Sequence, residues 1–269
     1  MKRNIVRQFT VLIALGLLVI TVVGCSTVPV TGRRSLNLVS ESQEMQLGLS
    51  SFDELKKETP ISRDPALNEL VQRVGKRIAT VAGKDMPNAQ WEFVVFESKE
   101  ANAFCLPGGK VGVYTGLLPI TQDEAGLATV MGHEIAHAVA RHGAERMSEA
   151  MVLQTGGQVI GATMANSQYQ GALMTAYGLG AKVGRELPHS RKQELEADNI
   201  GLTYMARAGY DPAAAIGFWQ RFSDYNKQRG GSQPMAFLST HPVDEVRIKQ
   251  LQELLPKAQQ EFVRSPVAK

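Results

Sequence analysis

The sequence predicts an α+β domain that is mostly helical, with a small β-sheet beside one long central helix. Three observations support this. Helix-start signals recur along the chain, two runs have the aromatic and β-branched character of strands, and the longest helical pattern places apolar residues four apart. Because the 269 residues are 43% hydrophobic and 20% charged, we expect one compact domain with a sizeable core.

The first residues have the pattern of an export signal. Basic Lys2, Arg3 and Arg7 precede an uncharged apolar run over Val11–Val23, which is short for a membrane-spanning helix. A small residue and then Cys25 follow, in the form of a lipobox, where the cysteine is lipidated and becomes the new N-terminus. We therefore predict a lipoprotein signal peptide over residues 1–24, with an uncleaved anchor as the alternative.

The resemblance to bacterial lipoproteins implies a location. A chain lipidated on Cys25 would be held by acyl chains on a membrane outside the cytoplasm, and Ser26 in place of Asp favours the outer membrane. This predicts a periplasm-facing protein of the bacterial cell envelope. Residues 25–40, with Pro29 and Gly32, are predicted to form the lipidated N-terminus and a tether, and residues 41–269 to form the folded domain.

Charge and cysteine content narrow the choice of partners. The formal net charge is +3, but three basic residues would leave with the signal, and the remaining Lys and Arg then equal the 26 Asp and Glu. A near-neutral chain is no candidate by charge for nucleic acid. If Cys25 is lipidated, Cys105 has no intramolecular partner, and we interpret it as a small buried hydrophobe rather than a reactive thiol.

The first half of the domain contains both predicted strands. A helix is predicted from about Glu41, and Asp64-Pro65 opens another, since Asp suits the N-cap and Pro the first helical position. The runs 91–96 and 110–114 are predicted strands, the second reached through a Pro-Gly-Gly turn. The Thr-x-x-Glu pattern at 121–124 is a capping box that should start the long central helix.

The second half is predicted to be helical. The uncharged stretch Met151–Ala181 is interpreted as a packed helical pair or a lid, with a membrane span as the less favoured alternative because it carries several polar side chains. A capping-box pattern at 190–193 predicts a helix to about Ala208. Asp211-Pro212 and His241-Pro242 are predicted to start two more helices.

Two histidines in the central helix have the spacing of metal ligands. His133 and His137 are four residues apart, so both imidazoles project from one helix face and can reach one ion. Glu134 points about 100° away around the helix, where its carboxylate could act as general base on a water bound to Zn²⁺. His142 lies about 140° from the ligand face, which favours packing over ligation.

A third ligand can come from the later helix. Glu194 and Asp198 share a face, so one could bind the metal while the other accepts the free ring N–H of a ligand histidine. Spacing alone does not decide which of the two carboxylates binds the metal and which accepts the ring N–H. Glu196 points elsewhere and is interpreted as structural.

Four sequence blocks together carry a family resemblance. They are residues 102–109, 133–137, 190–198 and 239–242, in this order along most of the chain. On these blocks the sequence resembles the zinc metallopeptidase family that includes HtpX, the CAAX prenyl-protein endopeptidases and the periplasmic BepA- and LoiP-type proteases. The resemblance implies a zincin-like fold with one catalytic Zn²⁺. It also implies Glu194 as the third ligand and Asp198 behind the ligands.

The same resemblance implies two further roles. Asn102 and the backbone of Ala103 would hold a polypeptide substrate as an added strand, although an ordinary edge strand is the alternative for Asn102. His241 would either donate to the oxyanion or occupy the open zinc position in a latent state. A neutral imidazole at a predicted helix N-terminus suits both roles, and a helix-capping histidine is the alternative.

We therefore expect a zinc-dependent endopeptidase that hydrolyses peptide bonds of unfolded or misassembled cell-envelope proteins. Proteolytic quality control is what the resemblance implies, whereas the residues themselves argue only for hydrolysis. One alternative is a latent protease that acts mainly as a periplasmic chaperone or outer-membrane assembly factor. A small-molecule metallohydrolase is another. Intact Glu134 favours an enzyme, because a structural metal site needs no base.

Overall fold

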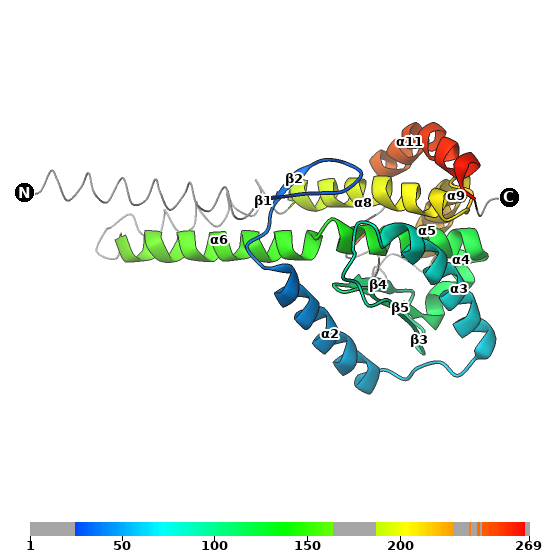
Figure 1. Cartoon of the computed structure of the whole chain (residues 1–269), viewed down its shortest axis with the longest axis horizontal. Helices are drawn as coiled ribbons and strands as arrows, with labels where there is room; N and C mark the ends of the chain where they lie inside the picture. Colours follow the sequence, from blue (N-terminus) through cyan, green and yellow to red (C-terminus); the bar gives the residue numbers. More distant parts are fainter. Residues whose placement is uncertain (1–24, 164–186, 229–236, 238–240, 243, 267–269) are drawn as a thin grey trace, which may run out of the picture.

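The computed structural model describes residues 25–163, 187–228, 237, 241, 242 and 244–266. The predicted fold class is confirmed, since the described chain is mostly helical with a small sheet. Helix α5 (Glu124–Val139) lies between a three-stranded sheet on one side and α8 (Leu187–Arg207) on the other (Figure 1). The predicted signal peptide, residues 1–24, lies outside the described residues.

The remaining elements surround this central pair (Figure 1). The other helices are α2 (Glu41–Glu58), α3 (Pro65–Ala82), η1 (Thr115–Leu117), α4 (Leu118–Thr121), α6 (His142–Thr163), α9 (Ala213–Gln228) and α11 (Glu245–Arg264). The strands are β1 (Cys25–Thr27), β2 (Arg34–Leu36), β3 (Glu92–Phe96), β4 (Ala103–Leu106) and β5 (Lys110–Tyr114). None of the described helices is long and apolar enough to cross a membrane.

The sheet places β4 at an edge. Its strand order is β3-β5-β4, with β3 and β5 parallel and β4 antiparallel to β5. Both predicted strands are confirmed as β3 and β5. Phe104 packs on one face of the sheet against Phe52, Phe96 and Tyr114, so Ala103 and Cys105 face the other way, toward α5.

Some helix starts are confirmed and others are wrong. Ser40 caps α2 with a capping box, and Asp64 caps α3 as predicted. The predicted cap at Thr121 is wrong. Gln122 has a positive φ of 64°, which ends α4 after Thr121, and Asp123 caps α5 through its bond from the Gly126 N–H.

Two later boundaries are also corrected. Helix α8 begins at Leu187, so the predicted start at Ser190 is three residues late. The last helix begins at Glu245 with Asp244 as its N-cap, so His241 is neither at its N-terminus nor its cap. The first part of the uncharged stretch, residues 151–163, is the second half of α6, where Met151 and Val152 are exposed. Residues 164–186 lie outside the described residues.

Residues 25–40, predicted as the lipidated N-terminus and a tether, contain a docked hairpin. Strands β1 and β2 pair as an antiparallel hairpin, and Val28 between them is 2% exposed in the main core. The hairpin is docked on α6 and α8, where Arg33 bonds Glu145 and Glu196. Pro29 and Gly32 therefore form a tight turn rather than a flexible spacer, because buried contacts hold the chain on both sides of them.

Helices α5 and α8 cross at a pair of glycines. A Cβ added to Gly201 would lie 2.8 Å from the backbone nitrogen of His133 and 2.9 Å from the carbonyl carbon of Gly132. A Cβ on Gly132 would lie 3.0 Å from the Gly201 carbonyl oxygen. The two helix backbones are thus in contact at this point. The contact brings side chains that lie one to two turns from the glycines on each helix close together.

The glycine contact gives a stability prediction. We expect Gly201→Ala to lower the free energy of unfolding by roughly 1–3 kcal/mol, because backbone atoms at the crossing cannot move aside as a flexible side chain could. Thermal unfolding measures this. Gly143→Ala in α6 is the matched control, since nothing lies within 4 Å of its added Cβ, and it should be neutral or stabilising. Equal effects of the two substitutions would contradict the crossing argument.

Candidate metal centre

Four side chains converge where α5 and α8 face one another. They are His133 and His137 from α5, Glu194 from α8 and His241 from the segment before α11, and their ligand atoms all lie within 4.8 Å of one another. His133 Nε2 lies 3.1 Å from His137 Nε2 and 3.2 Å from Glu194 Oε2, and His137 Nε2 lies 3.3 Å from Glu194 Oε1. Tetrahedral ligands of zinc are about 3.3 Å apart, so these spacings fit.

The donor set also fits a cation chemically. Glu194 Oε2 is buried and makes no hydrogen bond within the described part of the chain, although His133 Nε2 and Arg247 Nη1 lie 3.2 and 3.1 Å from it. Burial lowers the pKa of His137 well below its ordinary value, so its ring is neutral, as ligation requires. Burial opposes ionisation of Glu194, but the close contacts of its carboxylate with the His133, His137 and His241 rings hold its pKa far below the usual range.

His133 is held from behind by Asp198 and Arg247. Its Nδ1 lies 3.0 Å from Asp198 Oδ1, and Arg247 donates two bonds of 2.7 Å to the same carboxylate. Burial would lower the pKa of His133, but the bonds to Asp198 and Glu194 raise it to about 9. With Asp198 accepting from Nδ1–H, Nε2 faces the cluster and can bind a metal once it loses its proton.

His137 is held from behind by His142. The helix breaks at Arg141, whose φ is 56°, so His142 returns as the first residue of α6 and its Nδ1 lies 2.8 Å from His137 Nδ1. Nε2 of His142 lies 3.1 Å from Glu196 Oε2. His142 thus supports a candidate ligand, and Glu196, interpreted from the sequence as structural, holds His142.

Glu134 and His241 face each other beside the cluster. Glu134 is 5% exposed, and burial raises its pKa above the usual value. Its Oε1 lies 3.5 Å from His241 Nε2. His241 Nδ1 lies 2.9 Å from Glu194 Oε1 and 3.4 Å from His133 Nε2, and the ring packs on Phe237. His241 therefore reaches the cluster from a loop, not from the helix terminus that the sequence predicted.

Within the described residues, one edge of β4 is unpaired, and β4 lies against α5. The Tyr114 N–H donates to the Asn102 carbonyl at 3.0 Å, so Asn102 turns its carbonyl toward β5. Because backbone groups alternate along an antiparallel pair, Ala103 and Cys105 turn theirs to the open edge. Cys105 is half-buried rather than fully buried, and this burial raises the pKa of its thiol far above the usual value.

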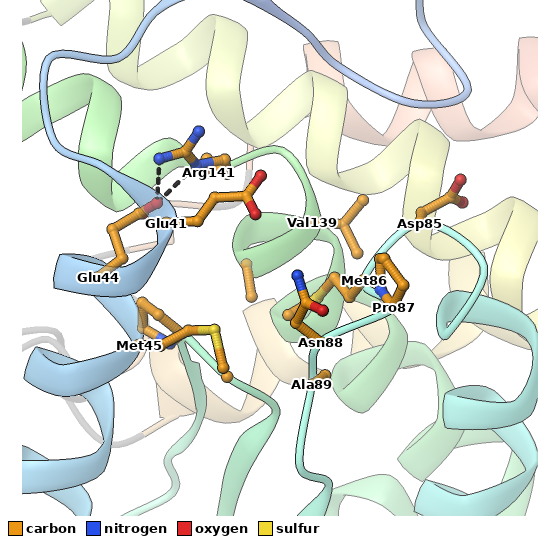
Figure 2. A pocket seen from close by; sticks show the side chains of 13 residues that line it. Glu41, Glu44, Met45, Asp85, Met86, Pro87, Asn88, Ala89, Val139 and Arg141 are labelled. Carbon is orange, nitrogen blue, oxygen red and sulfur yellow. Dashed lines mark hydrogen bonds and ion pairs between the residues drawn. The ribbon is translucent and has the colours of Figure 1, made fainter.

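A cavity lies at the far ends of β4 and α5 (Figure 2). It has a volume of about 80 Å³ and is lined by Pro107 and Gly108 after β4, by Val139 at the end of α5, and by Met45 and Met86. Arg141 and Glu44 form an ion pair at its rim (Figure 2). None of the four convergent residues lines it, so this cavity is separate from the candidate metal centre.

Sequence reasoning missed Arg247. It is 2% exposed, lies 4.3 Å from the Trp219 ring, and binds both Asp198 and Glu194. A signal existed, since Arg247 precedes the buried Leu251 by four residues and so occupies the apolar face of its helix. A cation on an apolar face indicates a buried anion opposite it.

The chain is similar to known peptidases. The model of Peptidase family M48 matches residues 65–255. The chain is 38% identical to the mitochondrial metalloendopeptidase OMA1 of Schizosaccharomyces pombe over 86% of this chain and 67% of that protein. It is 34% identical to the OMA1 of Saccharomyces cerevisiae over 88% of this chain and 71% of that protein.

Bacterial relatives are longer than this chain. The beta-barrel assembly-enhancing protease of Escherichia coli is 32% identical over 82% of this chain and 46% of its own length. The chain thus spans about half of that relative. The residues that the family model matches include all four convergent side chains of the candidate metal centre. The family match covers well over half of the chain, and the chain belongs to Peptidase family M48, whose members here are metalloendopeptidases.

Proposed function

We propose that this metalloendopeptidase uses zinc to cleave unfolded or misassembled proteins of the bacterial cell envelope. The observation that carries the proposal is the convergence of His133, His137 and Glu194 with a buried carboxylate, Glu134, beside them. A structural metal site would not need that carboxylate. Zinc is the ion that suits two imidazoles and a carboxylate at these spacings.

The chain's own residues can perform the hydrolysis. Bound at this centre, zinc would polarise the peptide carbonyl and acidify water. Glu134 is placed to take the proton of the attacking water and to pass it to the departing amine, and its raised pKa suits it to hold that proton between the two steps. Asp198 and His142 keep the ring N–H groups of the candidate ligands away from the ion.

The edge strand is proposed to bind the substrate. An extended polypeptide added to β4 would pair with the outward backbone groups of Ala103 and of Cys105. Asn102 would position the scissile residue at the start of this strand. An open edge accepts an extended chain better than a compact molecule, which favours an endopeptidase over a small-molecule hydrolase.

The cellular location is proposed from the N-terminal pattern. The signal pattern over residues 1–24 and the predicted lipidation of Cys25 favour an outer-membrane lipoprotein facing the periplasm. The yeast relatives are named as mitochondrial, so this part of the proposal rests on the sequence pattern and on the bacterial relatives.

A latent form is the second proposal. His241 Nδ1 lies close enough to Glu194 and His133 to take the fourth corner of a tetrahedral site. In that position it would exclude a water or a substrate carbonyl. A protein held in this state could act as a chaperone or assembly factor until a partner displaces His241.

Replacing Glu134 tests the proposed function. We expect Glu134→Gln to keep one bound zinc per chain but to lower casein cleavage by at least about 100-fold, because the general base is lost. Metal analysis and a digestion assay on the mature chain measure the two quantities. Glu58→Gln, at the exposed end of α2, is the matched control. Cleavage at the wild-type rate by the Glu134 variant would refute the mechanism.

Replacing His241 separates its two proposed roles. If His241 occupies the fourth position, His241→Ala should keep the metal and raise basal cleavage several-fold, since the blocking ring is removed. A loss of cleavage with the metal retained would identify an oxyanion donor instead. Unchanged cleavage together with unchanged metal content would contradict both roles.

A further inference from the structure

The N-terminal hairpin inserts an arginine between two buried carboxylates. Arg33, in the segment that leads into β2, donates two bonds to Glu145 at 2.6 and 2.9 Å and one bond to Glu196 at 2.7 Å. Glu145 belongs to α6 and Glu196 to α8, and their side chains are only 4% and 6% exposed. Thr31 from the same turn also donates to Glu196, at 2.5 Å.

This ion cluster is the outer end of a hydrogen-bond chain to the metal centre. Glu196 Oε2 lies 3.1 Å from His142 Nε2, and His142 Nδ1 lies 2.8 Å from His137 Nδ1. An ionised Glu196 accepts from His142 Nε2–H, which leaves His142 Nδ1 as the acceptor for His137 Nδ1–H. His137 Nε2 is then bare and directed at the cluster, in the tautomer that a metal ligand needs.

We propose that Arg33 is a positioning residue, through which the docked N-terminal hairpin holds His137 in its metal-binding tautomer by way of Glu196 and His142. The proposal rests on the metal centre of the proposed function. It makes this chain segment, which the sequence predicted to be a tether, a part of the catalytic domain.

The hydrogen bonds behind His137 resemble those behind His133. Behind His133, Asp198 is held by the two bonds from Arg247. Behind His137, Glu196 is held by Arg33, with His142 inserted between the carboxylate and the ligand. The hydrogen-bond chain behind each of the two histidines thus ends in a carboxylate that an arginine fixes in place. In the second case that arginine comes from outside the helices, at the start of the described chain.

The direct test is metal affinity. In the mature full-length chain, Arg33→Met should lower zinc affinity by roughly 10- to 100-fold in competition with a chelator, because loss of an outer hydrogen-bond partner loosens a ligand. It should also lower kcat more than it raises KM. Arg33→Lys should lose less, and Arg34→Met, one residue away and exposed, should keep wild-type affinity. Wild-type affinity in Arg33→Met would overturn the proposal.

A double-mutant cycle distinguishes positioning from general stability. His142→Phe removes the link between Glu196 and His137, so adding Arg33→Met to it should cause no further loss of zinc affinity. An equal further loss would mean that Arg33 acts by another route, and would overturn the proposal.

Arg33→Met combined with Glu145→Gln guards against misfolding, since it removes one of the two charges that Arg33 neutralises. It should fold and still bind zinc weakly, and recovery of wild-type affinity would again overturn the proposal.

The zinc-affinity readouts do not depend on peptidase activity. If the wild-type chain binds zinc but cleaves no protein, the proposed function fails while the role of Arg33 can still be measured. If Glu134→Gln behaves as predicted and Arg33→Met matches wild type in zinc affinity, only the positioning role fails.

Discussion

The contact of α5 with α8 at Gly132 and Gly201 is the constraint on which the rest of the structure depends. Helices that carry side chains at their crossing are usually held 8–10 Å apart, axis to axis, and a contact without Cβ atoms allows a closer approach. Glu194 lies about two turns before Gly201, and His137 lies just beyond one turn after Gly132, so the close crossing brings both to one point. The fold thus supplies three candidate ligands from two helices, without a loop that must be ordered by the metal.

Burying so many charged groups requires each to have a partner. Asp198 and Arg247 are 3% and 2% exposed, and Glu196 and His142 are 7% and 0% exposed. Breaking such a pair by removing one partner costs about 3–5 kcal/mol, whereas the intact pair adds little net stability. The burial of these pairs is therefore better explained by their role in orienting His133 and His137 than by a contribution to the stability of the fold. Glu134 is also buried, and its carboxylate faces the His241 ring, with Oε1 3.5 Å from Nε2.

Local patterns in the sequence predicted the local parts of the structure. The spacing of His133 and His137, the cap at Asp64 and the strand Lys110–Tyr114 depend on neighbouring residues, and all three appear as predicted. The start of α5 was misplaced because Gln122 adopts a positive φ that its residue type does not favour. Arg33 and Arg247 could not be assigned from spacing. The carboxylates that bind Arg33 lie 112 or more residues away along the chain, and Asp198 lies 49 residues from Arg247. Long-range ion pairs leave little trace in a single sequence beyond a charge on an apolar face.

The location of the metal tests the account most directly. A crystal structure of the zinc-loaded mature chain, with anomalous scattering recorded at the zinc edge, should show one ion at about 2.0–2.2 Å from His133 Nε2, His137 Nε2 and a carboxylate oxygen of Glu194. His142 and Asp198 should lie behind the two rings and away from the ion. An ion bound elsewhere, or held by the Nδ1 atoms of either ring, would contradict the account.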